Sequence, residues 1–178
     1  MTEDTKIIDH IIGGDIEAFE SLVQRYQRPI ISMVRNLIGD EHICEDIAQE
    51  VFFAAYKKLR AFDESQSKFS TCLFTIARNK SINYLRRKKI ISFGKLPDNV
   101  ESNIDTDTPE RAELFEKLNG LLQKLPNAQK RAFTLAEFEN LSYEDIAQIE
   151  GIRLGTVRSR IHRAKKKIAK ALKDHKAD

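Results

Sequence analysis

The 178-residue sequence predicts an all-α fold of two small helical domains joined by a flexible linker. Apolar residues recur at steps of three and four from one end of the chain to the other, and no convincing alternating strand pattern appears. Between two such regions lies a stretch with Gly94, Pro97 and many Asp, Asn and Thr residues, which is typical of a linker. The expected organisation is a domain at 1–91, a linker at 92–109 and a domain at 110–178.

Four helices are expected in the first domain. Pro29 suits the opening turn of a helix, so it is expected to start the second one. The third has acidic residues near its start and basic residues near its end, which complement the helix dipole. A polar loop at 63–68 separates it from the fourth. The expected helices cover about 16–26, 29–38, 41–60 and 71–89.

The second domain is expected to hold four short helices that share one core. The first two should lie near 110–124 and 127–139. Ser142 with Asp145 three positions later forms a capping-box signature, which predicts the start of the third helix. Gly151 should end that helix, and a long basic helix follows almost at once.

The last helix combines a buried stripe with a basic face. No acidic residue occurs from Gly151 to Lys173, and Ser159, His162 and Lys166 point most directly away from the stripe. A helix fits the major groove, where Arg can grip guanine edges and Lys can hold phosphates. The alternative is an ordinary solvated charged helix, and for His162 surface placement is an equal possibility. The apolar stripe comprises Leu154, Val157, Ile161, Ala164, Ile168 and Leu172.

The runs 141–147, Gly151-Ile152 and 154–164 together resemble region 4 of the extracytoplasmic-function sigma factors of the sigma-70 family. The sequence departs from that pattern at Glu150, where the family often has an apolar residue, and at Arg153, often proline. The resemblance implies binding of the minus-thirty-five promoter element as duplex. If Arg160 reads a base, Arg160→Ala should weaken that binding by about 1–3 kcal/mol. The implied contact residues are Thr156, Arg158, Ser159, Arg160, His162, Arg163 and Lys166.

The third helix of the first domain has a polar stripe opposite its apolar side. This stripe includes Phe53, and an exposed aromatic among acids suits the docking of a protein partner. The alternative is that Phe53 packs inside its own domain. The run Cys44 to Phe52 resembles sigma region 2.2, which implies docking on the β′ clamp of RNA polymerase. The expected docking residues are Asp46, Gln49, Glu50 and Phe53.

The fourth helix carries polar residues at steps of four and three beside a basic run, a pattern that suits single-stranded nucleic acid. The runs 68–79 and 84–87 resemble sigma regions 2.3 and 2.4, which implies a surface that flips out and holds bases of the minus-ten element. Cys72 stands where the family usually has tryptophan. Phe69 and Phe74 are expected to pack in the core. For Tyr84 the sequence leaves open whether the side chain packs or contacts nucleic acid. The implied contact residues are Lys68, Ser70, Thr75, Arg78, Asn79, Asn83, Tyr84, Arg86 and Arg87, with Asn83 where aspartate is frequent.

Several classes of function are not indicated. Cys44 and Cys72 lie far apart and outside any zinc or disulfide spacing, so no metal is expected. No phosphate-binding loop or nucleophile triad is visible, so we expect no cofactor, no small-molecule substrate and no catalysis. No apolar run is long enough to insert stably in a membrane, which predicts a cytoplasmic protein.

The resemblance implies three partners: core RNA polymerase, through the β′ clamp and the β flap, promoter DNA, and an anti-sigma factor. The rival hypotheses are a conventional DNA-binding regulator, a helical enzyme that modifies nucleic acid, and a sigma-like module that only titrates a regulator. Association with core polymerase and promoter opening would separate them.

Overall fold

The computed structural model describes residues 2–91, 118 and 120–174. Among these residues all regular structure is helical and none is a strand, which confirms the predicted all-α class. The chain divides into two compact units, Met1–Pro97 and Asp98–Asp178. The expected linker, 92–109, and most of the helix expected at 110–124 lie outside the described residues, although 118 and 120–123 are helical.

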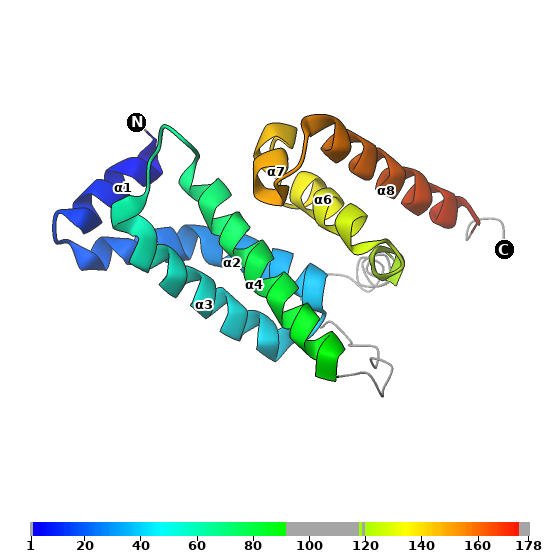
Figure 1. Ribbon diagram of the computed structural model, residues 1–178, viewed down its shortest axis with the longest axis horizontal. Helices are drawn as coiled ribbons and strands as arrows, with labels where there is room; N and C mark the ends of the chain where they lie inside the picture. The colour runs from blue at the N-terminus through cyan, green and yellow to red at the C-terminus, as the bar shows by residue number, and fades with distance from the viewer. Residues whose placement is uncertain (1, 92–117, 119, 175–178) are drawn as a thin grey trace, which may run out of the picture. The chain divides into compact units, whose positions relative to one another are not determined.

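Unit 1 is a bundle in which α2, α3 and α4 pack on one another (Figure 1). Its centre contains Leu22, Ile30, Met33, Val51 and Leu73, all fully buried. Phe69 and Phe74 are also buried, as expected. The elements are α1 (Glu3–Ile12), η1 (Ile16–Ala18), α2 (Phe19–Ile38), α3 (Glu41–Lys58), η2 (Leu59–Ala61) and α4 (Phe69–Ile91).

The expected break at Pro29 is wrong, because α2 runs as one helix through the proline. A proline inside a helix removes one backbone hydrogen bond and usually kinks or ends it. Here the buried stripe keeps its helical spacing on both sides, with Leu22 before Pro29 and Ile30, Met33 and Val34 after it. Packing of this stripe against α3 and α4 outweighs the local penalty.

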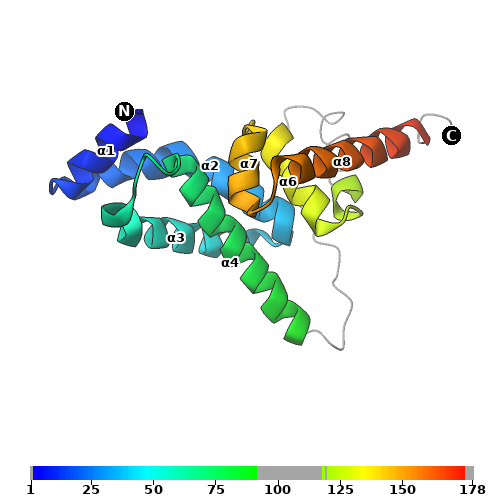
Figure 2. The same cartoon turned by 45° about the horizontal axis from the view of Figure 1, so that its top comes forward.

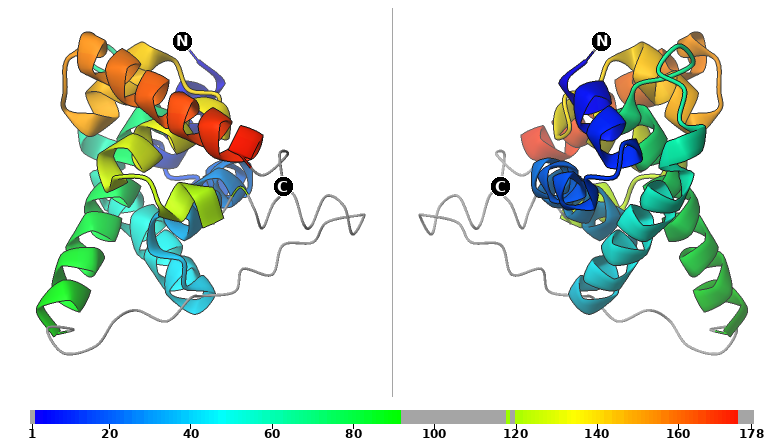
Figure 3. Two further views of the ribbon diagram at one scale, coloured as in Figure 1. Left: turned by 90° about the vertical axis from the view of Figure 1, so that its right-hand side faces the viewer. Right: turned by 90° about the vertical axis from the view of Figure 1, so that its left-hand side faces the viewer.

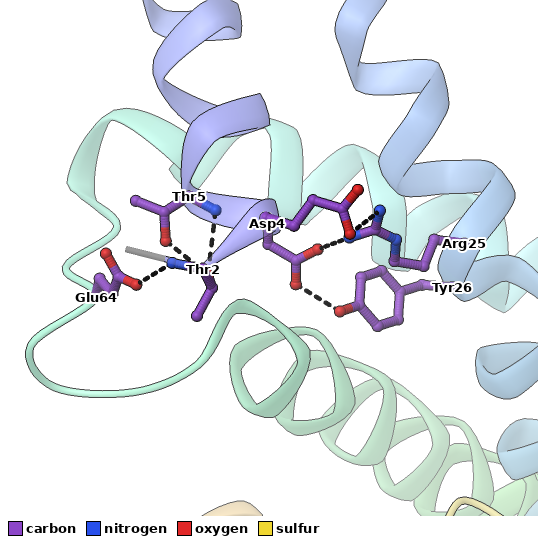
Figure 4. A network of polar contacts seen from close by, with 7 residues as sticks. Thr2, Asp4, Thr5, Arg25, Tyr26 and Glu64 are labelled. Atoms are coloured by element: carbon purple, nitrogen blue, oxygen red, sulfur yellow. Dashed lines mark hydrogen bonds and ion pairs between the residues drawn. The ribbon is translucent and has the colours of Figure 1, made fainter.

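Helix α1 was not among the expected elements, although the sequence contains a signal for it. Thr2 caps it, since its hydroxyl accepts a hydrogen bond from the Thr5 amide at 3.3 Å. Ile8 and Ile11 are buried, one helical turn apart. Asp4 accepts hydrogen bonds from Arg25 and from the Tyr26 hydroxyl on α2 (Figure 4). Burial and then the bond to Asp4 raise the pKa of Tyr26.

Unit 2 contains α6 (Asn127–Glu137), α7 (Tyr143–Glu150) and α8 (Leu154–Asp174), with α6 packed on both others. In Figure 2, α7 and α8 follow each other through a short turn. The predicted stripe of α8 is confirmed at Val157, Ile161, Ala164 and Ile168, which are buried. Leu154 and Leu172 at its ends are half-buried. The unit's core also includes Leu122, Leu125 and Phe133.

A buried lysine on α6 makes the stability of unit 2 depend on pH. Lys130 is 3% exposed, its ammonium donates to Gln123 at 2.8 Å, and burial lowers its pKa from 10.5 to about 8. Below pH 8 the folded chain holds a desolvated charge. Between pH 8 and 10.5 the unfolded chain binds the extra proton, so stability should rise by about 3 kcal/mol at most.

We expect Lys130→Met to be more stable than the wild type at pH 7, and this advantage should shrink as pH rises from 8 to 10.5. Urea denaturation followed by circular dichroism at several pH values measures the difference. A constant difference between the two proteins across this range would contradict the prediction.

Candidate nucleic-acid interface

A helix-turn-helix in unit 2 positions the basic helix. The Ser142 hydroxyl caps α7 by accepting a hydrogen bond from the Asp145 amide at 3.0 Å, as the capping signature predicts. Gly151 ends α7 with a left-handed φ of +64°, a conformation that glycine adopts without strain. The Ile152 amide donates to the Ala147 carbonyl at 3.0 Å, and α8 begins two residues later.

One face of α8 is exposed and basic. Of the predicted contact residues on this helix, Arg158, His162, Arg163 and Lys166 are exposed. Thr156 and Ser159 are half-buried, and the Ser159 hydroxyl donates to the Thr156 carbonyl at 3.0 Å. The structure therefore brings four of the predicted side chains to one solvent-facing surface, where they could reach the groove and backbone of a duplex.

Arg160, the remaining predicted contact, points instead towards a buried carboxylate. The side chain of Glu150 has no exposed surface. Arg131 of α6 holds it with two hydrogen bonds, both 2.8 Å long. Arg160 adds a third contact at 3.3 Å, and its own side chain is 25% exposed. Sequence reasoning missed this cluster, which unites three helices.

The predicted stripe on α3 is exposed along its whole length. Asp46, Gln49 and Glu50 face solvent, and Phe53 is 60% exposed, so Phe53 does not belong to the core of its own unit. The Lys57 ammonium lies over the Phe53 ring, 4.1 Å from its centroid. The Glu50 carboxylate pairs with Lys80 of α4. This surface offers an aromatic side chain framed by charges.

The second half of α4 is the exposed part of that helix. Its last turns diverge from α3 (Figure 3), and Asn79, Asn83, Arg86 and Arg87 face solvent, as does Lys68 before the helix. The other predicted contact residues are partly buried or hydrogen-bonded within unit 1. Tyr84 is half-buried, Thr75 donates to the Thr71 carbonyl, Arg78 donates to Asn79, and Ser70 is hydrogen-bonded to Tyr26.

A pocket of about 320 Å³ opens beside the loop between α3 and α4, and no sequence pattern predicted it. Phe62 and Phe69, whose ring centroids are 5.8 Å apart, line it together with the polar side chains of Gln66 and Ser67. Asp63 stiffens the loop by accepting hydrogen bonds from the amide and hydroxyl of Ser65, which lower its pKa. The remaining lining residues are Ala55, Lys58, Leu59, Ala61, Asp63 and Cys72.

The Cys72 side chain forms part of the pocket wall, and burial raises the pKa of its thiol. Over residues 2–91 and 118–174, apart from 119, no group of three or more His, Cys, Asp and Glu side chains could hold a metal ion. No helix in the same part of the chain is long and apolar enough to cross a bilayer.

Each of the two units matches a known protein family. Residues 22–90 match the family model of sigma-70 region 2, and residues 115–168 match that of sigma-70 region 4. The RNA polymerase sigma-H factor of Pseudomonas aeruginosa is 35% identical over 96% of this chain and 94% of its own. An ECF RNA polymerase sigma-E factor of Haemophilus influenzae is 36% identical over 93% of each chain.

A solved structure gives the same match in three dimensions. The chain is similar to the sigma factor RpoE of Bartonella quintana, solved in complex with the anti-sigma factor NepR. The TM-score is 0.77 with 25% sequence identity, over 87% of this chain and 96% of that one.

Proposed function

The chain belongs to the extracytoplasmic-function group of RNA polymerase sigma factors, and from this premise we propose how its two units divide the recognition of a promoter. As a sigma factor it acts in transcription initiation with core RNA polymerase and promoter DNA. Unit 2 binds the minus-thirty-five element as duplex. Unit 1 docks on core polymerase and holds unpaired bases of the minus-ten element.

The exposed basic face of α8 is the observation that carries this proposal. It follows a capped helix and a left-handed glycine, the arrangement in which a second helix enters the major groove. Arg158, Arg163 and Lys166 supply positive charge for phosphates and donors for base edges, with His162 between them.

Arg163→Ala should therefore reduce the salt dependence of promoter binding by the holoenzyme. If Arg163 contacts one phosphate, the slope of log affinity against log salt should fall by about 0.9, because one fewer counterion is released. Fluorescence titration of labelled promoter duplex at several salt concentrations gives this slope. Lys124→Ala, which removes an exposed lysine of unit 2 outside α8, is the control and should leave the slope unchanged.

In unit 1 the α3 stripe is the proposed docking site for the β′ clamp, with Phe53 as its anchor. The pocket beside the loop is the proposed site for a flipped base of the minus-ten element. Its volume lies within the range of about 300–1,000 Å³ that is usual for small-ligand sites, and its aromatic wall suits stacking. Asn79, Asn83, Arg86 and Arg87 on α4 would contact the strand that leads from this pocket.

Three further properties belong to the proposal. Sigma factors are non-catalytic initiation factors, so the chain should have no enzymatic activity of its own. It should work where bacterial core polymerase works, in the cytoplasm. An anti-sigma protein should hold it inactive, a regulation supported by the Bartonella quintana neighbour, whose structure contains such a partner.

Transcription in vitro tests the function directly. Core RNA polymerase with the purified chain should start transcripts from promoter fragments that core enzyme alone does not use. Permanganate footprinting should then show unpaired thymines near the minus-ten element. Association with core polymerase but no promoter-directed start on any genomic promoter fragment would count against the proposal and would favour a module that titrates a regulator.

A further inference from the structure

The buried Arg131–Glu150–Arg160 cluster separates the arginines of α8 into two groups. Arg158 and Arg163 are exposed, whereas three quarters of the Arg160 side chain is covered and its guanidinium contacts Glu150. The family pattern often has an apolar residue at the position of Glu150. In this chain the position holds a carboxylate that is fully buried.

The carboxylate of Glu150 needs positively charged partners because it is fully removed from water. Arg131 on α6 makes a bidentate contact with Glu150, the geometry in which arginine binds a carboxylate most strongly. Arg160 supplies a second positive charge from α8. Glu150 therefore joins α6, α7 and α8 at one point near the start of the basic helix.

The position of Arg160 on its helix agrees with this contact. Its neighbours in the buried stripe, Val157 and Ile161, are covered by the rest of the unit, so the Arg160 side chain starts close to the core. To read a guanine edge it would have to leave Glu150, and a hydrogen bond to a buried charge would be lost. Arg158 and Arg163 can reach DNA without such a loss.

We propose that Glu150 is a positioning residue that keeps Arg160 away from DNA and fixes the orientation of α8, so that the exposed residues alone read the minus-thirty-five element. This inference rests on the proposed role of unit 2. It reverses the expectation that Arg160 contacts a base. Arg160 is held by Glu150, and Arg131 supplies the stronger contact that keeps Glu150 in place.

A double-mutant comparison in the holoenzyme tests the proposal. In the wild-type background, Arg160→Ala should change affinity for a promoter duplex less than twofold, with unchanged base preference across a library of upstream elements. In a background with Arg131→Met and Glu150→Leu, which removes the buried carboxylate together with its bidentate partner, Arg160 is released. There Arg160→Ala should weaken binding fivefold or more and lower the salt slope by about 0.9.

Glu150→Gln provides a second background that keeps the shape of the side chain and weakens its hold on Arg160. The same change in the effect of Arg160→Ala is expected there, although smaller. Arg160→Lys, which retains a positive charge for Glu150, should bind as the wild type does in the unaltered background. Hydrogen exchange of peptides from α6 to α8 checks that each variant is folded.

Loss of binding and of base preference on Arg160→Ala in the wild-type background, to the extent seen for Arg163→Ala, would overturn the proposal. An equal effect of Arg160→Ala in all backgrounds would do the same. Neither outcome would contradict the proposed binding of the minus-thirty-five element by unit 2. A wild-type holoenzyme that ignores the upstream element would instead refute the role of unit 2 and this inference with it.

Discussion

Glu150→Ala is expected to destabilise unit 2 by about 3–5 kcal/mol, because it leaves two arginines without the carboxylate that they share. Arg131 is affected most, since its side chain is only 13% exposed and gives both of its charged hydrogen bonds to Glu150. A change of this size is a large fraction of the stability of a small domain. Hydrogen exchange of α6, α7 and α8 in the intact chain measures the loss locally.

Glu137→Ala is the matched control for this prediction. Glu137 is also a glutamate of unit 2 in an ion pair, with Lys165 at 2.8 Å, but both side chains are partly exposed. Exposed pairs contribute about 0–1 kcal/mol, so this variant should stay close to the wild type. The charge-free pair Arg131→Met with Glu150→Leu should recover most of the stability, and equal exchange rates in Glu150→Ala and the wild type would disprove the role of the cluster.

Phe53→Ala is expected to weaken association with core RNA polymerase by about 2 kcal/mol or more, which is a loss of affinity of about thirtyfold. Exposed aromatics at the centre of a docking surface often dominate its binding energy, and Phe53 lies in the middle of charged neighbours with Lys57 over its ring. Because the side chain is 60% exposed, its truncation should leave the stability of unit 1 nearly unchanged. Surface plasmon resonance with immobilised core enzyme measures the affinity.

Ile16→Ala is the control for Phe53→Ala. Ile16 is an apolar side chain of the same unit with nearly the same exposure, 62%, and it lies in η1 outside the α3 stripe. Its truncation should leave core binding unchanged. Similar losses for both variants would indicate a general effect of surface hydrophobicity, and no loss for Phe53→Ala would remove α3 as the docking site.

The Glu50 side chain both pairs with another helix of unit 1 and remains open to a partner. It belongs to the predicted stripe, yet it pairs with Lys80 on α4 and remains 64% exposed. An exposed ion pair of this kind contributes little to stability. Glu50 can therefore meet a basic group of a partner at the rim of the contact, while Phe53 provides the apolar centre.

The sequence determined the parts of the protein that depend on local spacing. The steps of Val157, Ile161, Ala164 and Ile168 placed the buried side of α8, and with it the basic face, because helical periodicity alone decides which side chains share a face. Ser142 and Gly151 marked both ends of α7, since a cap and a left-handed residue act within a few positions of the chain.

Tertiary structure decided the features that need segments far apart in the chain. Pro29 predicts a break locally, but packing on α3 and α4 carries α2 through it. The pocket exists only where the ends of α3 and α4 and their loop come together. In the sequence Arg160 is one of many basic side chains. Only the fold buries Glu150, pairs it with Arg131, 19 residues away, and brings Arg160 against it. Burial and pairing depend on distances in space, which periodicity does not encode.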